Sequence, residues 1–288
     1  VSDRQFVYRL LGTLTLCLFF ASGCENEQST LSQKDVTFFG TGKVSRYQQV
    51  NDGSLQQLEP LFFAEIFITD GGTVKNATVK LPEITGETKG LEYRYSESEE
   101  IGDVMYISAM LDSFESLEDK FPMGDYSFSF ETSEGEVKDS IVSYKNSSFP
   151  PHPKIIFIQN EKKIEINEVD SEKELIITWP KFNVGKKDPK NILDDPIFVA
   201  IDSCNVEDIV HSGRPFEKNG YLTYEATEYS VPAGKLEPGQ KYNMYVEHAI
   251  FTDTQNDNGM PGFATLASST YMSFKTIGNH DPNYCREN

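Results

Sequence analysis

Short stretches in which apolar and polar residues alternate constrain this chain more than any other feature of its sequence. Aromatic residues and serines alternate through Tyr126–Phe130, which places the aromatic rings on one face of an extended strand. Between residues 35 and 145 no segment is long enough for a crossover helix, so a parallel sheet is not expected there. The sequence therefore predicts an all-β fold built from antiparallel β-sandwiches.

Residues 35–145 are expected to form the first sandwich. Seven strand candidates follow one another, with turn signals such as Asn51-Asp52-Gly53 between them, and this spacing is typical of an antiparallel sandwich. The tract Phe121–Tyr126 resembles the entry to a late strand in bacterial immunoglobulin-like modules. The expected strands are Val36–Tyr47, Leu61–Thr69, Val74–Leu81, Leu91–Ser96, Val104–Ser113, Asp125–Thr132 and Val137–Tyr144.

Residues 146–153 are rich in proline and mark the boundary between two bodies. Proline cannot donate to a sheet ladder, and adjacent prolines favour an extended, stiff connection. We therefore expect a linker that fixes the spacing of two domains without a large interface.

Residues 154–277 are expected to form the second sandwich. Apolar residues alternate up to Trp179, and the tract Leu236–Val246 reads Leu-Glu-Pro-Gly-Gln-Lys-Tyr-Asn-Met-Tyr-Val. Together these stretches resemble a fibronectin type III domain. The resemblance implies that Trp179 lies in the core and that Tyr242 forms a tyrosine corner, bonding back near Leu236. A tail, 278–288, follows.

The long connection between the last two strands of this body, 252–269, is expected to carry an apolar tip. Met260 and Phe263 lie in it, and Lys186 and Lys187 lie in the loop that the type III strand order implies beside it. These residues form a possible binding loop. Alternatively, the tip packs on the first body, and the lysines meet acidic residues of the neighbouring loop, dock on the first body or bind an acidic polymer.

The N-terminal stretch resembles a bacterial lipoprotein leader. The apolar run Leu10–Phe20 has eleven residues, which is too short to span a membrane. It is followed by Ala21-Ser22-Gly23-Cys24, which resembles a lipobox. The resemblance implies a signal peptide, 1–24, a palmitate-type lipid on Cys24 that anchors the chain in a membrane, and a flexible tether, 25–34. Glu25 after the cysteine favours the outer membrane or cell surface. The alternative is an ordinary secretory signal.

Two further cysteines, Cys204 and Cys285, lie in the second half. The strand order of the type III resemblance brings both to the pole away from the first body, which implies a disulfide between them. Two free thiols, or an intermolecular bridge from Cys285, remain the alternatives.

The formal net charge of −19 disfavours nucleic acid as a partner, because nucleic acid requires a basic face. No nucleophile, phosphate-binding or metalloprotease motif occurs. The four histidines are far apart in sequence and lack the spacing of metal ligands. Asp194 and Asp195 are adjacent, whereas a glycosidase pair faces across a cleft. The stretch Asp253–Gly259 departs from the pattern of a calcium-binding loop. We therefore expect no cofactor, no metal and no enzymatic activity.

These features predict a membrane-anchored cell-envelope lipoprotein that serves as a non-enzymatic binding, adhesion or scaffold module. Its expected partner is an envelope protein or a glycan. The alternative is a carbohydrate-binding or polysaccharide-processing accessory protein. That alternative requires an exposed aromatic platform, for which Tyr221, Tyr224 and Tyr229 are the nearest candidates.

Overall fold

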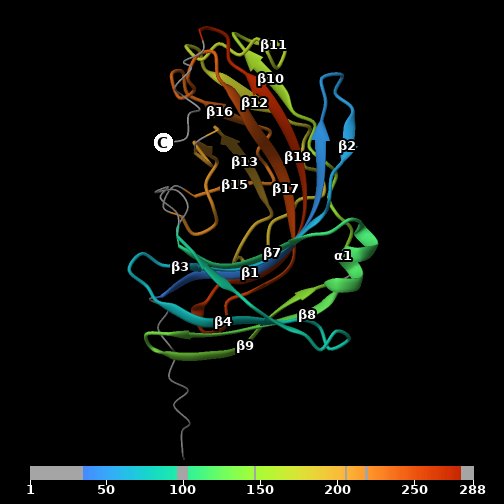
Figure 1. Ribbon diagram of the computed structural model, residues 1–288, viewed down its shortest axis with the longest axis vertical. Coiled ribbons are helices and arrows are strands. Elements are labelled where there is room, and N and C mark those ends of the chain that lie inside the picture. The colour runs from blue at the N-terminus through green and yellow to red at the C-terminus, as the bar shows by residue number, and fades with distance from the viewer. Residues whose placement is uncertain (1–34, 96–102, 146, 205, 218–219, 280–288) are drawn as a thin grey trace, which may run out of the picture. The chain divides into compact units, whose positions relative to one another are not determined.

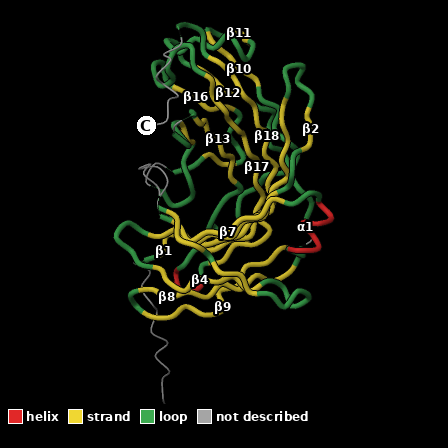
Figure 2. Tube along the Cα trace, in the orientation of Figure 1, coloured by secondary structure: helices red, strands yellow, loops and turns green. Residues whose placement is uncertain are grey.

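In the computed structural model, the described residues are 35–95, 103–145, 147–204, 206–217 and 220–279. Strands dominate this part of the chain (Figure 2), and the predicted all-β fold is confirmed. The predicted leader, Cys24 and the tether lie outside the described residues, so the lipid anchor stays a prediction. No described helix is long and apolar enough to cross a membrane.

The largest of the three sheets has ten strands and extends through both halves of the chain (Figure 1). Its main path is β14-β13-β17-β18-β1-β3-β7-β6, with β15 beside β13 and β2 beside β1. In chain order these strands are β1 (Val36–Gln49), β2 (Leu55–Gln57), β3 (Leu61–Ile68), β6 (Glu92–Arg94), β7 (Val104–Met110), β13 (Pro196–Asp202), β14 (Val210–His211), β15 (Leu222–Thr223), β17 (Lys241–Gln255) and β18 (Gly262–Lys275).

Two four-stranded sheets pack against this long sheet and enclose two separate hydrophobic cores. The first has the order β5-β4-β8-β9 and the second β11-β10-β12-β16. Their strands are β4 (Val74–Lys80), β5 (Thr88–Gly90), β8 (Gly124–Thr132), β9 (Gly135–Tyr144), β10 (Ile156–Gln159), β11 (Lys162–Ile164), β12 (Leu175–Thr178) and β16 (Glu228–Val231). Two short helices, α1 (Phe114–Lys120) and η1 (Asp257–Gly259), lie in connections.

The first sandwich places β1-β3-β7-β6 opposite β5-β4-β8-β9, an immunoglobulin-like strand order. The alternation through β8 places Tyr126, Phe128 and Phe130 in the core, each at most 1% exposed. The Tyr126 hydroxyl donates to the Pro122 carbonyl at 2.9 Å, so this buried phenol keeps a hydrogen-bond partner.

The second sandwich places β10-β12-β16 opposite β14-β13-β17-β18, the strand order of a fibronectin type III-like domain. Trp179, Leu236 and Tyr242 are buried in its core. The Tyr242 hydroxyl accepts a hydrogen bond from the backbone N–H of Glu237 at 2.7 Å, which is the contact of a tyrosine corner, one residue past Leu236.

The two sandwiches are joined edge to edge, which the sequence did not predict. β1 pairs in parallel with β18 through ten residue pairs, from Phe39 opposite Gly262 to Gln48 opposite Tyr271. This pairing occupies an edge of each sandwich that would otherwise leave backbone N–H and C=O groups unpaired. The parallel ladder lies between the two sandwiches, and the ladders within each sandwich are antiparallel, as predicted.

The proline-rich segment is not the expected spacer, because it lies against the long sheet. The Pro150 carbonyl accepts from the Ser268 hydroxyl at 2.6 Å, and the Pro151 carbonyl accepts from Nδ1 of His248 at 3.2 Å. Nε2 of His152 and the hydroxyl of Ser45 share a hydrogen bond of 3.0 Å. The segment therefore connects side chains of β1, β17 and β18.

Two glycines of β1 let aromatic rings lie directly on its backbone. A Cβ atom at Gly42 would lie 2.2 Å from the Phe63 ring, and one at Gly40 would lie 2.6 Å from the Phe263 ring. Carbon atoms do not approach this closely without displacement. These glycines therefore fix the position of two rings that line the site described next.

Candidate binding groove

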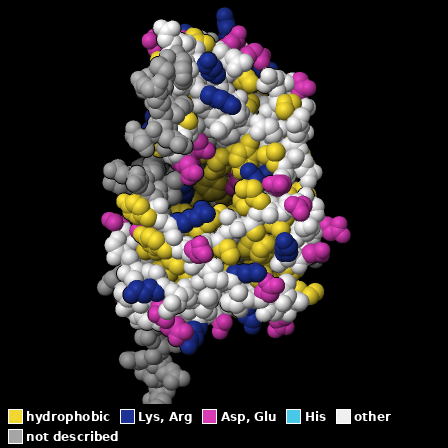
Figure 3. All heavy atoms as spheres, in the orientation of Figure 1, with side chains coloured by type: hydrophobic (Ala, Val, Ile, Leu, Met, Phe, Trp, Pro, Cys, Tyr) yellow, Lys and Arg dark blue, Asp and Glu magenta, His cyan; other side chains and the backbone are white. Residues whose placement is uncertain are grey.

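The candidate site is a cavity of about 250 Å³ on the face of the long sheet that points away from the two cores. The alternation along β17 defines this face, since Val246 and His248 are buried in the second sandwich whereas Tyr245 and Glu247 line the cavity. Figure 3 shows hydrophobic side chains gathered around a hollow, with acidic and basic side chains among them. We call this cavity the groove.

Both sandwiches contribute to the groove. β3 and β7 supply one wall, β13 and β17 supply the other, and β1 and β18 lie between them. Small side chains in the middle, Val44, Ala249 and Thr265, leave the hollow open. Aromatic rings surround them: Phe38, Phe63, Phe67, Tyr106, Phe198, Tyr245, Phe251, Phe263 and Tyr271.

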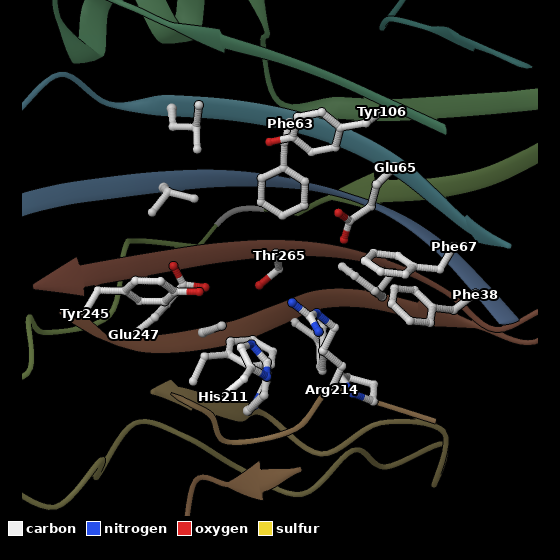
Figure 4. Close-up of a pocket in the computed structure, with 18 of the residues that line it drawn as sticks. Phe38, Phe63, Glu65, Phe67, Tyr106, His211, Arg214, Tyr245, Glu247 and Thr265 are labelled. Atoms are coloured by element: carbon white, nitrogen blue, oxygen red, sulfur yellow. The ribbon is translucent and has the colours of Figure 1, made fainter. Parts of the chain in front are cut away.

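Two carboxylates project into the groove, Glu65 from β3 and Glu247 from β17 (Figure 4). Burial raises the pKa of Glu65 to about 8; Arg214 opposes this shift and Glu247 adds to it. Burial raises the pKa of Glu247 to about 7, against a hydrogen bond from the Ser269 hydroxyl and the charge of Arg46. Within the described ranges, no ion pair reaches either carboxylate.

Arginine side chains stack on aromatic rings at the groove. The guanidinium of Arg214 lies 5.9 Å from the Phe67 ring centroid, that of Arg46 lies 4.8 Å from Tyr271, and that of Arg94 lies 4.3 Å from Tyr106. Three cation–π contacts thus lie around this cavity. The rings of this face therefore already hold cations of the protein itself.

Arg214 is itself neutralised by acidic neighbours. Nη2 lies 2.9 Å from Asp208, and Nη1 lies 3.4 Å from Glu217. Beside it, burial and the charge of Arg214 lower the pKa of His211 to about 3. His211 is therefore a neutral imidazole at physiological pH, and its Nδ1 accepts the backbone N–H of Gly213 at 3.1 Å.

The arrangement is suited to binding. The Thr265 hydroxyl in the middle of the groove donates to the Ile250 carbonyl at 3.0 Å, so its proton is already used within the sheet. Among the residues that the structure describes, no group of three potential metal ligands comes together. A hollow of aromatic rings with a few converging polar groups is the usual form of a small-molecule site.

The predicted binding loop, 252–269, does not carry the expected apolar tip on its surface. Met260 is 3% exposed and packs in the first core, and Phe263 is 6% exposed and packs beside Phe38. The expectation of an exposed apolar tip is wrong, because β17 and β18 continue through most of 252–269. The alternative, packing on the first body, is what the structure shows, although the Phe263 ring also lines the groove.

The lysine-rich loop and the three tyrosine candidates do not come together in one binding surface. Lys186 and Lys187 are exposed and do not line the groove. In the same loop, Lys190 lies 3.2 Å from Asp253, so this basic loop meets the acidic end of β17. The three tyrosines are half-buried, and their hydroxyls bond to separate neighbours: Tyr221 to Asp194, Tyr224 to Glu225 and Tyr229 to His211.

Cys204 is exposed after β13, and Cys285 lies outside the described residues. The Cys204–Cys285 disulfide therefore stays a prediction.

Sequence reasoning missed every charged residue of the groove. One signal for Glu65 was present, because the strand Leu61–Ile68 carries apolar residues on both faces and a single carboxylate. Apolar residues on both faces indicate a strand covered on both sides. A charged residue at such a position indicates a partly buried site.

The strand order defines an all-β protein of two immunoglobulin-like sandwiches, the second of them fibronectin type III-like. No protein-family model matches the chain, and no curated protein matches it. Several solved structures show remote similarity, including the following two. One holds the FN1–FN3 domains of chicken CNTN1, with 10% identity over 84% of this chain and 64% of that chain, at a TM-score of 0.25.

The other is the BSP domain of a biofilm-associated protein, with 13% identity over 77% of this chain and 28% of that chain, at a TM-score of 0.20. The chain thus spans less than two thirds of either matched chain. The strand order, and not these remote similarities, defines the fold.

Proposed function

We propose that this protein is a non-enzymatic binding module of the cell envelope and that the groove is its ligand site. The observation that carries the proposal is the pair of desolvated carboxylates, Glu65 and Glu247, within a ring of aromatic side chains. Burying carboxylates without ion-pair partners costs stability. Perturbed carboxylates in a cavity are typical of functional sites.

The position of the groove supports the same proposal. The outer face of an antiparallel sheet normally meets water and is polar. Here it holds a contiguous apolar hollow (Figure 3), and concentrated apolar surface of this kind indicates an interaction site. The aromatic rings that line the groove provide flat faces for a ligand.

We further propose that the chain acts from a membrane, through a lipid on Cys24, as an adhesion or scaffold protein of the outer membrane or cell surface. The apolar run before Ala21-Ser22-Gly23-Cys24 supports this part of the proposal. Labelling cells with a radioactive fatty acid tests it. Label should enter the wild-type protein and be absent from a Cys24→Ser variant, and equal label in both would contradict lipid attachment at Cys24.

A carbohydrate ligand is the second candidate, because aromatic rings beside hydrogen-bonding carboxyl groups also suit sugar rings. A glycan array and a pull-down with envelope proteins distinguish the two kinds of partner.

Both assays should use the wild type, a Phe63→Ala variant and an Ile84→Ala control. Phe63 lines the groove, whereas Ile84 is 85% exposed and lies outside it. Binding that is retained by the control and lost by Phe63→Ala supports the groove as the site. Binding that survives in a folded Phe63→Ala variant would contradict it.

A further inference from the structure

We infer that the groove takes a small organic cation, namely an ammonium group carried on an apolar body, with Glu65 and Glu247 as its charge partners. The inference rests on the proposed function, since it names the ligand chemistry of the same groove.

The two carboxylates face a common space. Glu65 lies on β3 and Glu247 on β17, with β18 and β1 between them. Three strand spacings of about 4.8 Å, roughly 14 Å in all, separate β3 from β17 across the sheet. The two residues are also offset along the strands: Glu65 pairs with Gly40, whereas Glu247 pairs with Ser269 and is level with Arg46, about 20 Å further along β1. Both side chains point into the cavity from opposite walls (Figure 4). A ligand in the groove therefore lies between the two carboxylates rather than in direct contact with both.

The charge of Arg214 acts on Glu65 and that of Arg46 acts on Glu247, but within the described ranges neither arginine forms an ion pair with these carboxylates. Arg214 carries Asp208 and Glu217 as its own ion-pair partners. Arg46 is held at the rim, where Nε donates to the Tyr271 hydroxyl at 3.3 Å and the guanidinium stacks on the same ring. An incoming ammonium would add a counter-charge within the groove, whereas an anionic ligand would add a third negative charge to it.

The rings favour the same class of ligand. Cations bind to the faces of aromatic side chains, and the attraction is strongest where water is excluded. Phe63 and Tyr245 lie around the carboxylates in Figure 4. The formal net charge of −19 adds a long-range field that attracts cations and repels anions.

Binding of a cation should be coupled to release of protons. With pKa values of about 8 and about 7, the carboxyl groups of Glu65 and Glu247 are largely protonated at pH 6 and ionised at pH 9. A permanent cation should therefore bind more tightly as the pH rises. A neutral ligand of the same size should show no such dependence.

The test is isothermal titration calorimetry of the full chain in a non-ionic detergent. The probes are benzyltrimethylammonium, whose charge is independent of pH, the neutral benzyl alcohol and the anionic benzoate. We expect the ammonium to bind tightest and its affinity to rise roughly tenfold or more between pH 6 and pH 9. Equal or tighter binding of benzyl alcohol or benzoate, or an affinity independent of pH, would overturn the inference.

Variants locate the charge partners. Glu65→Gln and Glu247→Gln keep the shape of each side chain and should each weaken ammonium binding at pH 9 by roughly tenfold. Glu228→Gln is the matched control, because Glu228 is exposed on β16 and outside the groove. Unchanged binding by both groove variants would overturn the inference, and circular dichroism of each variant verifies folding.

Failure of this inference can be separated from failure of the proposed function. If the ammonium does not bind but an envelope partner or glycan still depends on Phe63, the groove is a site for another ligand class and only the inference fails. If the partner binds equally to wild type and Phe63→Ala, the proposed function fails as well.

Discussion

Replacing Glu65 by glutamine should stabilise the protein at alkaline pH. The pKa of Glu65 rises from 4.5 to about 8 because folding removes its carboxyl group from water. A raised folded-state pKa means that stability is fully present below 4.5 and is lost as the pH rises through 8. At 1.36 kcal/mol per unit, the shift corresponds to about 5 kcal/mol, and partial exposure at the groove reduces this to about 2–3 kcal/mol.

Glutamine has nearly the same shape as glutamate but carries no charge, so Glu65→Gln should not lose folding stability as the pH rises. We expect Glu65→Gln to be more stable than the wild type by about 2 kcal/mol at pH 9 and equally stable near pH 4.5. Urea unfolding at several pH values, followed by the fluorescence of the single tryptophan, Trp179, measures the difference. Glu228→Gln should follow the wild type throughout.

The result that would refute this reasoning is a parallel pH dependence for the wild type and Glu65→Gln. The carboxyl group of Glu65 would then be as well solvated in the folded chain as in the unfolded chain. In that case the groove would not desolvate its carboxylates, and the argument for a functional site would lose its main support.

Three further predictions concern the shared sheet. Burial lowers the pKa of His248 to about 4, so the stability that its neutral form contributes should be lost as the pH falls from 6.5 through 4. The melting temperature of His248→Gln should not show this fall between pH 6.5 and 4. Gly42→Ala should cost about 1–3 kcal/mol by displacing Phe63, whereas Gly90→Ala, which meets nothing within 4 Å, should leave the melting temperature unchanged. A fragment of residues 35–153 should lack a cooperative unfolding transition by circular dichroism, because β1 loses its pairing with β18; a cooperative transition in this fragment would contradict the shared sheet.

Local alternation accounts for most of the strands. The pattern through Tyr126–Phe130 predicted which side chains face the first core. The resemblance of the tract around Tyr242 to a fibronectin type III domain implied the corner of the second sandwich. Both features depend on residues close together in sequence. Periodicity records which face of a strand is buried, and this is why it sufficed here.

The junction and the groove depend on pairing between distant parts of the chain. Phe39 and Gly262 are neighbours across β1 and β18 although more than 200 residues separate them. The local alternation of apolar and polar residues does not determine which strand edge of one sandwich pairs with which strand edge of the other. The same pairing turns the expected loop 252–269 mostly into strand, and it places Glu65 and Glu247 in one cavity.

The groove as a ligand site is the central claim, and locating a bound probe tests it most directly. Crystals soaked with 4-bromobenzyltrimethylammonium at pH 9 would give an anomalous signal from the bromine. The account predicts one dominant peak within the groove, with the ammonium between Glu65 and Glu247. A dominant peak elsewhere on the protein, with an empty groove, would contradict it.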